Sequence, residues 1–194
     1  MKRHTRRHLL AGLLACLPAA ALARGGIHFS FDTGSSRGRR YRGRRVVPWR
    51  GPEEPGTIVI ITRERALYHI LPGGRAVRYG VGVGRAGFQW SGVAHVGRKA
   101  IWPDWRPPKE MIRRELVQYG RRLPDVMKGG IHNPLGARAL YLYRNGRDTM
   151  YRIHGTNAPQ TIGQAVSSGC IRMLNEEIIE LFDKVPLGTK VIVR

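Results

Sequence analysis

The stretch Ala76-Val77-Arg78-Tyr79-Gly80-Val81-Gly82-Val83 carries the clearest structural signal in this chain of 194 residues. Its larger apolar side chains stand at every second position, which is the period of a β-strand with one buried face. Short apolar runs of similar length occur at residues 57–62, 66–70, 139–143, 150–153 and 190–193. We therefore predict a mainly β fold.

Turn residues separate these runs. The segment Leu71-Pro72-Gly73-Gly74 predicts a tight turn, and Asn145-Gly146 is the dipeptide typical of a two-residue hairpin. One helix is predicted at about residues 175–185, where Asn175 can cap the first turn and three apolar residues share a face: Ile178, Phe182 and Val185. No βαβ rhythm is present, so we predict a β-sandwich or barrel of mixed strands with this C-terminal helix and few other short helices.

The composition excludes several classes of protein. The chain has 34 Lys and Arg against 13 Asp and Glu, a formal net charge of +21, and two cysteines. Two cysteines that lie far apart do not make a disulfide-rich scaffold, and the sequence has neither a Gly-X-Y period nor heptads. Such a positive charge favours anionic partners.

Residues 1–23 have the three parts of an export signal: a basic start, the apolar run 9–20, and Ala21-Leu22-Ala23 as a cleavage site. Within them, Thr5-Arg6-Arg7-His8-Leu9-Leu10 resembles a bacterial twin-arginine signal. The apolar stretch 9–23 is short for a bilayer span, which disfavours a retained anchor. Residues 13–16 also resemble a weak lipoprotein box, and the alternative to cleavage after Ala23 is then a lipidated N-terminus at Cys16. We expect export to the periplasm of a Gram-negative bacterium.

A basic linker is predicted at residues 24–56, before a single folded domain at residues 57–194. Residues 34–50 are rich in Arg and Gly and lack apolar periodicity. We interpret this segment as a tether that adheres to anionic envelope polymers, and a solvated linker without a ligand is the alternative. Export disfavours a nucleic-acid partner.

Cys170 is the one cysteine that remains if the leader is cleaved, so it has no partner for a disulfide within its own chain. Small residues precede it in Ser167-Ser168-Gly169-Cys170, and Arg172 follows two positions later. These neighbours leave the thiol approachable and can lower its pKa. The alternative is a buried thiol that only fills space. His154 lies sixteen positions upstream, at the end of a predicted strand.

These motifs resemble the active-site signature of the YkuD-type L,D-transpeptidases, which are enzymes of bacterial peptidoglycan. The similarity lies in His154-Gly155-Thr156-Asn157, in Ile162-Gly163 and in residues 167–173, and it extends to residues 103–108, 130–136 and 188–191. It covers about residues 57–194. Several family members have a histidine where this chain has Ser168, so His154 is the base that the resemblance leaves.

The resemblance implies acyl transfer with Cys170 as nucleophile and His154 as proton acceptor and donor. The thiolate attacks a peptidoglycan stem tetrapeptide before its terminal D-Ala, and an amine then takes the acyl group. This amine belongs to another stem, which gives a 3-3 cross-link and links the enzyme to cell-wall biogenesis and cell shape, or to an envelope protein. Attack by water gives an L,D-carboxypeptidase. We expect the N–H groups of Gly169 and Cys170 to form the oxyanion hole.

Further candidates for substrate binding are Arg172, Ser167, Trp105, Asn133 and Tyr151. Arg172 can hold a carboxylate or steady the thiolate, and a salt bridge is an almost equal alternative. Each of the other residues also has a structural alternative, as packing or as a turn hydroxyl. After the predicted leader, which contains His4 and His8, the sequence has no His-x-x-x-His pair and no cluster of carboxylates, so we predict neither a metal nor a cofactor.

Two other classes of protein compete with this interpretation. In papain-like wall hydrolases the cysteine precedes the histidine, and in sortases the interval between them is much longer. A non-catalytic basic wall-binding module is the other alternative, although the pair of Cys170 and His154 argues against it.

Overall fold

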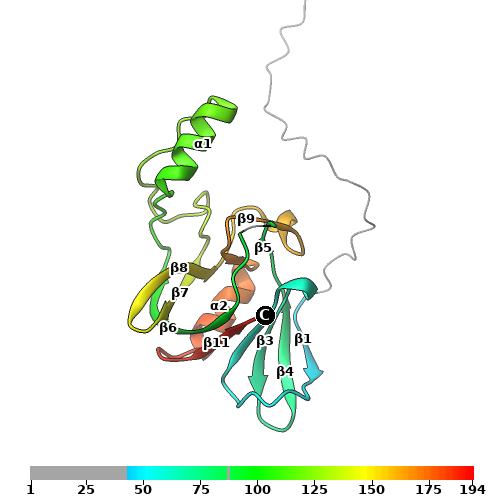
Figure 1. The fold of residues 1–194 in the computed structure, drawn as a ribbon. Helices are drawn as coiled ribbons and strands as arrows, with labels where there is room; N and C mark the ends of the chain where they lie inside the picture. Colours follow the sequence, from blue (N-terminus) through cyan, green and yellow to red (C-terminus); the bar gives the residue numbers. More distant parts are fainter. Residues whose placement is uncertain (1–42, 87) are drawn as a thin grey trace, which may run out of the picture. The chain divides into compact units, whose positions relative to one another are not determined.

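The computed structural model describes residues 43–86 and 88–194, which form a mainly β protein with two α-helices (Figure 1). The predicted leader and residues 24–42 of the predicted linker lie outside these residues. Among the residues described, no helix is both long and apolar enough to cross a lipid bilayer.

Nine strands form one mixed sheet, and two more strands form a small parallel pair. In spatial order the large sheet consists of β1 (Arg45–Pro48), β4 (Arg75–Gly80), β3 (Ala66–Leu71), β2 (Ile58–Ile61), β11 (Lys190–Val193), β6 (Gly92–Ile101), β7 (Arg138–Arg144), β8 (Arg147–His154) and β10 (Ile171–Arg172). The pair is β5 (Val83–Gly84) with β9 (Ala165–Ser167). Most neighbours are antiparallel, whereas β11 runs parallel to β2 and β10 runs parallel to β8. The predicted mainly β fold of mixed strands is confirmed.

The predicted turns have the backbone that their residues favour. Gly73 and Gly74 both have positive φ between β3 and β4. Asn145 (φ 50°) and Gly146 (φ 72°) join β7 to β8, as expected for a hairpin turn with two left-handed residues. Two short 3-10 helices, η1 (Thr62–Glu64) and η2 (Pro159–Thr161), complete the connections.

The first strand differs from the expected tether. Residues 45–48 form β1, which pairs antiparallel with β4, and Val47 packs against a small apolar cluster with Trp49. The folded part of the chain thus begins before residue 57. The arginines around Val46 and Val47 mask the apolar signal of a strand that is only four residues long.

Helix α2 (Asn175–Lys184) confirms the predicted C-terminal helix and packs against β7. Its buried apolar side chains are Ile178, Leu181 and Phe182, which join the main core with β2, β3, β7 and β11. The prediction that Asn175 caps this helix is wrong, because the Asn175 side chain bonds to other loops instead. At the other end, the Lys99 Nζ donates to the carbonyls of Phe182 (2.5 Å) and Val185 (2.7 Å).

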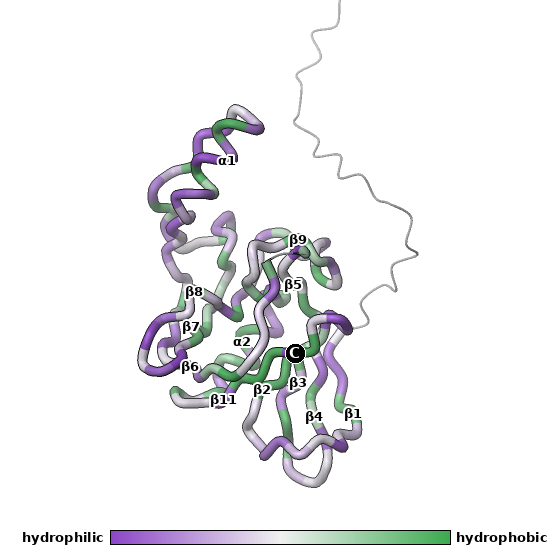
Figure 2. The backbone as a smooth tube through the Cα atoms, viewed as in Figure 1, coloured by the Kyte–Doolittle hydropathy of each residue, from purple (hydrophilic) through white to green (hydrophobic). Residues whose placement is uncertain are grey.

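Helix α1 (Lys109–Tyr119) was not predicted individually and has no buried residue. It lies in the connection between β6 and β7, set apart from the sheet in Figure 1. Figure 2 shows the contrast in hydropathy, because α1 is mostly hydrophilic whereas β2 is strongly apolar. The core therefore sits between the sheet and α2, and α1 takes no part in it.

Candidate active site

The parallel pairing of β8 with β10 brings the two predicted catalytic residues to one sheet edge. Ile171 pairs with Ile153 and Arg172 pairs with His154, and the Met173 N–H donates to the His154 carbonyl (2.8 Å). Cys170 comes directly before β10. Arg172 and His154 are direct partners across the two strands, so their side chains lie on the same face of this edge. Two residues that are sixteen positions apart in the sequence thus come to the same sheet edge, where the charges of Arg152 and Arg172 act on both of them.

The imidazole of His154 is held in one tautomer. Its Nδ1 lies 2.6 Å from the carbonyl oxygen of Gly155, which only accepts hydrogen bonds, so Nδ1 carries the proton. The Nε2 atom is then left with a lone pair, as a general base requires. Burial lowers the pKa of His154 to about 4, and the positive charges of Arg172 and Arg152 act in the same direction. The carbonyls of Gly155 and Leu135 oppose this shift.

Asn175 fixes the loop that follows His154. Its Oδ1 accepts the N–H groups of Ala137 (3.0 Å) and Thr156 (3.2 Å), and its Nδ2 donates to the Thr156 carbonyl (3.0 Å). A Cβ at Gly155 would lie 2.1 Å from this Oδ1. Glycine is therefore required where the loop turns away from His154. This role of Asn175 was not predicted from the sequence, where its position suggests a helix cap.

Cys170 is half-buried, and its sulfur lies 4.0 Å from the carbonyl oxygen of Met150. Burial raises the pKa of the thiol, and this effect outweighs the opposing influence of the Arg152 N–H and of two guanidinium groups, those of Arg152 and Arg172. The charge of Arg172 does act to lower the thiol pKa, as the sequence suggested, but the effect of burial is larger and has the opposite direction. The sequence could not predict this balance, because neighbours along the chain do not show how far the thiol is buried.

Hydrogen bonds of Ser167 hold the loop before Cys170, and only glycine fits at position 169. Ser167 Oγ donates to the Cys170 carbonyl (2.7 Å) and accepts the Gly169 N–H (3.2 Å). Gly169 has φ 111°, and a Cβ there would lie 2.5 Å from the ring of Tyr151. The Gly169 N–H, one of the two expected oxyanion donors, is thus engaged by Ser167. The Cys170 N–H has no hydrogen-bond acceptor among the described residues.

Arg172 lies beside this pair with unused hydrogen-bonding capacity. Its Nε and Nη2 atoms are buried and have no hydrogen-bond partner within the described part of the chain. Its guanidinium packs against Gly82, where a Cβ would lie 2.9 Å from Nη2. Burial lowers the pKa of Arg172. The salt bridge considered from the sequence is not among those found in residues 43–86 and 88–194.

The other three candidates are placed differently. Tyr151 stacks on Trp90, with ring centroids 4.9 Å apart, and borders Gly169. Trp105 pairs through its backbone with Met127, in the connection that contains α1. Asn133 is buried, and the two hydrogens of its Nδ2 are shared among three carbonyls at 3.0 Å, those of Pro103, Met127 and Lys128. Tyr151 thus lies at the site, whereas the contacts of Asn133 serve the loop structure.

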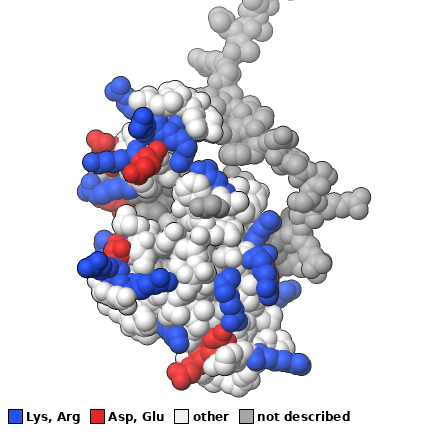
Figure 3. All heavy atoms as spheres, viewed as in Figure 1, with Lys and Arg blue, Asp and Glu red and all other residues white. Residues whose placement is uncertain are grey.

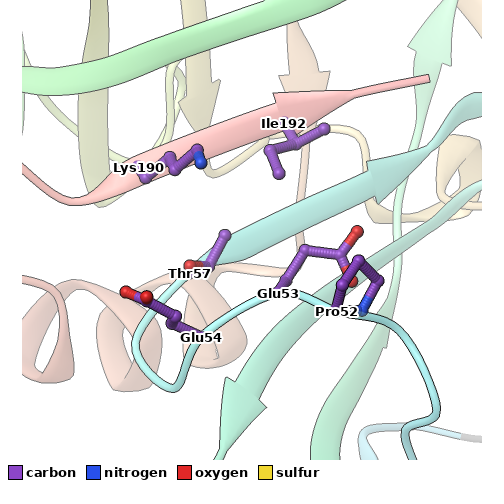
Figure 4. A pocket seen from close by; sticks show the side chains of 6 residues that line it. All are labelled: Pro52, Glu53, Glu54, Thr57, Lys190 and Ile192. Carbon is purple, nitrogen blue, oxygen red and sulfur yellow. The ribbon is translucent and has the colours of Figure 1, made fainter.

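A hollow of the described surface lies away from these residues. It has a volume of about 270 Å³ and is lined by Pro52, Glu53, Glu54, Thr57, Lys190 and Ile192 (Figure 4). The Glu53 carboxylate already accepts Trp49 Nε1 (3.0 Å) and pairs with Arg194 (3.0 Å). No candidate site residue lines this hollow. Nor does any group of three His, Cys, Asp or Glu side chains in the described residues have an arrangement that suits a metal ion.

The comparison with protein families gives one match over most of the chain. The model of the YkuD family, described as the L,D-transpeptidase catalytic domain, matches residues 55–193. The probable L,D-transpeptidase ErfK/SrfK of Escherichia coli (strain K12) is 41% identical over 139 residues, which are 69% of this chain and 42% of that protein. The chain thus spans less than half the length of this curated relative.

Two solved structures share the architecture. A structure from Brucella melitensis, named a probable carnitine operon oxidoreductase caia, is 46% identical, with a TM-score of 0.52 over 78% of this chain and 92% of that chain. An L,D-transpeptidase from Mycobacterium smegmatis has a TM-score of 0.50 over 71% of this chain and 58% of that chain. At 17% identity the latter likeness concerns the fold alone.

Proposed function

The chain belongs to the YkuD family of L,D-transpeptidase catalytic domains, and from this premise we propose that Cys170 and His154 carry out acyl transfer on peptidoglycan stem peptides. The observation that carries the proposal is the Nδ1–H tautomer of His154 beside Cys170, which leaves Nε2 as the base. The donor is a stem tetrapeptide, and the bond that breaks joins its third residue to the terminal D-Ala.

The first half of the reaction starts from a neutral thiol and a neutral imidazole at pH 7, because burial raises the pKa of Cys170 and lowers that of His154 to about 4. Nε2 takes the thiol proton as the sulfur attacks the carbonyl carbon. The resulting imidazolium, in a site that disfavours its charge, is a strong acid and gives the proton to the departing D-Ala amine. A thioester on Cys170 remains.

The second half is the reverse proton relay with a new nucleophile. An amine attacks the thioester carbonyl, His154 accepts one of its protons, and the sulfur leaves and regains a proton. The amine comes from a neighbouring stem or from an envelope protein, and water in its place gives L,D-carboxypeptidase activity. The Cys170 N–H is the donor for the oxyanion in both halves, since the Gly169 N–H is shared with Ser167.

Arg172 supplies positive charge at this edge and binds a carboxylate of the donor stem. Its guanidinium has two N–H-bearing atoms without a partner in the described residues, and a carboxylate is the group that guanidinium binds best. Tyr151 and Ser167 shape the loop on the Cys170 side. We assign Trp105 and Asn133 to the structure of the connection between β6 and β7 rather than to the substrate.

The envelope is the proposed place of action. Residues 1–23 read as an export leader, and the described face of the molecule shows many more Lys and Arg than Asp and Glu side chains (Figure 3). Anionic wall polymers are the matching partners for such a surface and for the basic linker. The name of the Brucella melitensis structure points to different chemistry, and the pair of Cys170 and His154 favours acyl transfer.

Mass spectrometry of reaction products tests this function. The purified chain is incubated with a disaccharide tetrapeptide, alongside Cys170→Ala, His154→Ala and Lys128→Ala, the last of which removes an exposed cation of the connection as a control. We expect a dimer that lacks one D-Ala with the wild type and the control, and none with the other two variants. Tripeptide without dimer would indicate hydrolysis or a protein acceptor. Unchanged tetrapeptide would favour the wall-binding module.

A further inference from the structure

Strand β8 contains an unusual backbone conformation close to the sulfur of Cys170. Met150 has φ 64°, in the left-handed region that residues other than glycine rarely adopt. It lies where the pairing of β7 with β8 shifts register, between Tyr141 and Tyr143. The Met150 side chain is 69% exposed, so packing of that side chain does not account for the conformation. Left-handed residues at strained positions often mark functional sites.

The carboxylate of Asp148 holds this conformation from both sides. Its Oδ1 accepts the Met150 N–H (2.8 Å). The Asp148 carboxylate also forms a bidentate salt bridge with the Arg152 guanidinium, with Nη1–Oδ1 at 2.7 Å and Nη2–Oδ2 at 2.8 Å. The Arg152 guanidinium lies over the ring of Tyr141 at 4.3 Å as well. One carboxylate therefore connects the residues before and after the left-handed turn.

The edge of β8 that this turn shapes is directed at Cys170. The His154 carbonyl points to β10, since it accepts the Met173 N–H, and main-chain groups two residues apart on a strand point to the same edge. The N–H of Arg152 thus also points toward β10, which has no residue to pair with it before Ile171. The sulfur of Cys170 takes that place, and the Met150 carbonyl lies 4.0 Å from Sγ as an acceptor for the thiol.

We propose that Asp148 is a positioning residue, which holds the left-handed turn at Met150 and thereby seats the sulfur of Cys170 between two main-chain groups of β8. The Met150 carbonyl accepts from the thiol, and the Arg152 N–H donates to the thiolate. When the proton passes from Sγ to Nε2 of His154, the sulfur exchanges one partner for the other. Both protonation states of the nucleophile then have a hydrogen bond.

The charged groups around the sulfur shift the thiol pKa in opposite directions, so two explanations of the role of Asp148 can be told apart. Arg152 and Arg172 lower the thiol pKa, Asp148 raises it, and His154 is neutral at pH 7. If Asp148 acted only through its charge, its removal would lower the thiol pKa. If Asp148 holds the turn, its removal misdirects the Arg152 N–H and raises the thiol pKa. The two explanations thus predict opposite signs.

The experiment measures the rate of alkylation of Cys170 by iodoacetamide against pH, resolved by peptide mass spectrometry. We expect Asp148→Ala to raise the apparent thiol pKa by about half a unit or more and to lower kcat with little change in KM. Asp104→Ala is the matched control, because Asp104 also accepts one backbone N–H and pairs with one cation, in the connection between β6 and β7. We expect the control to leave the thiol pKa unchanged.

A rescue variant separates the turn from the charge. Glycine adopts a left-handed φ without help, so Met150→Gly combined with Asp148→Ala should return the thiol pKa to the wild-type value or below it. A lowered pKa in Asp148→Ala, or no rescue in the double variant, would overturn the proposal. Where Asp148→Ala alone fails to fold, the double variant against Met150→Gly decides in the same way. The inference rests on Cys170 as the proposed nucleophile, but alkylation needs no substrate, so it fails or succeeds independently of transpeptidation.

Discussion

Two groups of neighbouring strands in the nine-stranded sheet differ in how regular they are. We call the group of β2, β3 and β11 the regular side and the group of β7, β8 and β10 the irregular side. On one side, all four residues of β2 are buried and apolar, and β2 pairs with β3 and β11 without a register shift. On the other side, β8 carries a register shift and the left-handed Met150, and it ends in the buried polar His154. The regular side supplies stability, and the irregular side positions reactive groups. Substitutions on the two sides should therefore have different consequences.

The largest effect is expected for Cys170→Ala, on the irregular side. Without the sulfur no thioester forms, so acyl transfer should fall by about a thousand-fold or more. Stability should change by less than about 1 kcal/mol, because the residue is only half-buried. Product analysis and chemical denaturation measure the two quantities. A variant that lost its stability together with its activity would contradict the separation of the two sides.

The corresponding substitution on the regular side is Leu67→Ala in β3. Leu67 is fully buried in the main core, and removal of its side chain should cost about 2–5 kcal/mol of the unfolding free energy. The activity per folded molecule should stay at the wild-type value. Urea denaturation gives the first quantity, and initial rates below the melting transition give the second. A large fall in the rate of the folded variant would mean that the core also sets the geometry of the site.

The stability of the folded chain should depend on pH through His154. The pKa of His154 is lowered to about 4 in the folded state, against about 6.5 in an unfolded chain. The unfolded chain therefore binds the proton more tightly, and the stability from this residue is complete above pH 6.5 and is lost as pH falls toward 4. The loss should reach about 3 kcal/mol.

Melting curves of the wild type and of His154→Gln over pH 4–8 measure this loss by difference. The comparison is needed because burial also lowers the pKa of His69, which adds a similar slope to both proteins. Parallel curves for the two proteins would show that His154 titrates normally.

The smallest effect is expected on α1, which belongs to neither side. Val117 is 75% exposed, and Val117→Ser should change the unfolding free energy by no more than about 0.5 kcal/mol. Urea denaturation is again the measurement. A loss above 1 kcal/mol would show that α1 contributes to the core after all.

The sequence predicted the elements whose patterns are local. The hairpin at Asn145-Gly146 and the C-terminal helix both appear in the structure. The strand predicted at residues 76–83 is only partly right, because β4 ends at Gly80 and Val83 begins β5 of the small parallel pair. Helix α1 was not predicted, because none of its residues is buried and the helix therefore has no face that packs on the core. The family membership was also predictable, since the motifs around His154 and Cys170 stand in a fixed order.

The sequence did not predict the features that depend on distant contacts. Asn175 stands where a helix cap is expected, yet loops from elsewhere in the chain use its amide. Asp148 and Arg152 lie four positions apart, a spacing that would suggest a helix, and only the turn at Met150 brings them together on a strand. The direction of the thiol pKa depends on burial, which no neighbour of Cys170 reveals.

The amide of Asn133 has a consequence for how this protein can be altered. Within the long connection between β6 and β7, it binds carbonyls on both sides of residues 104–126, those of Pro103, Met127 and Lys128, and so closes this segment at its base. A loop closed at its base is insulated from the sheet, because a change in its length adds only a small entropic cost. Residues 106–126 are therefore a natural place for insertion or exchange of a foreign segment, and a graft there leaves the register of β6 and β7 intact.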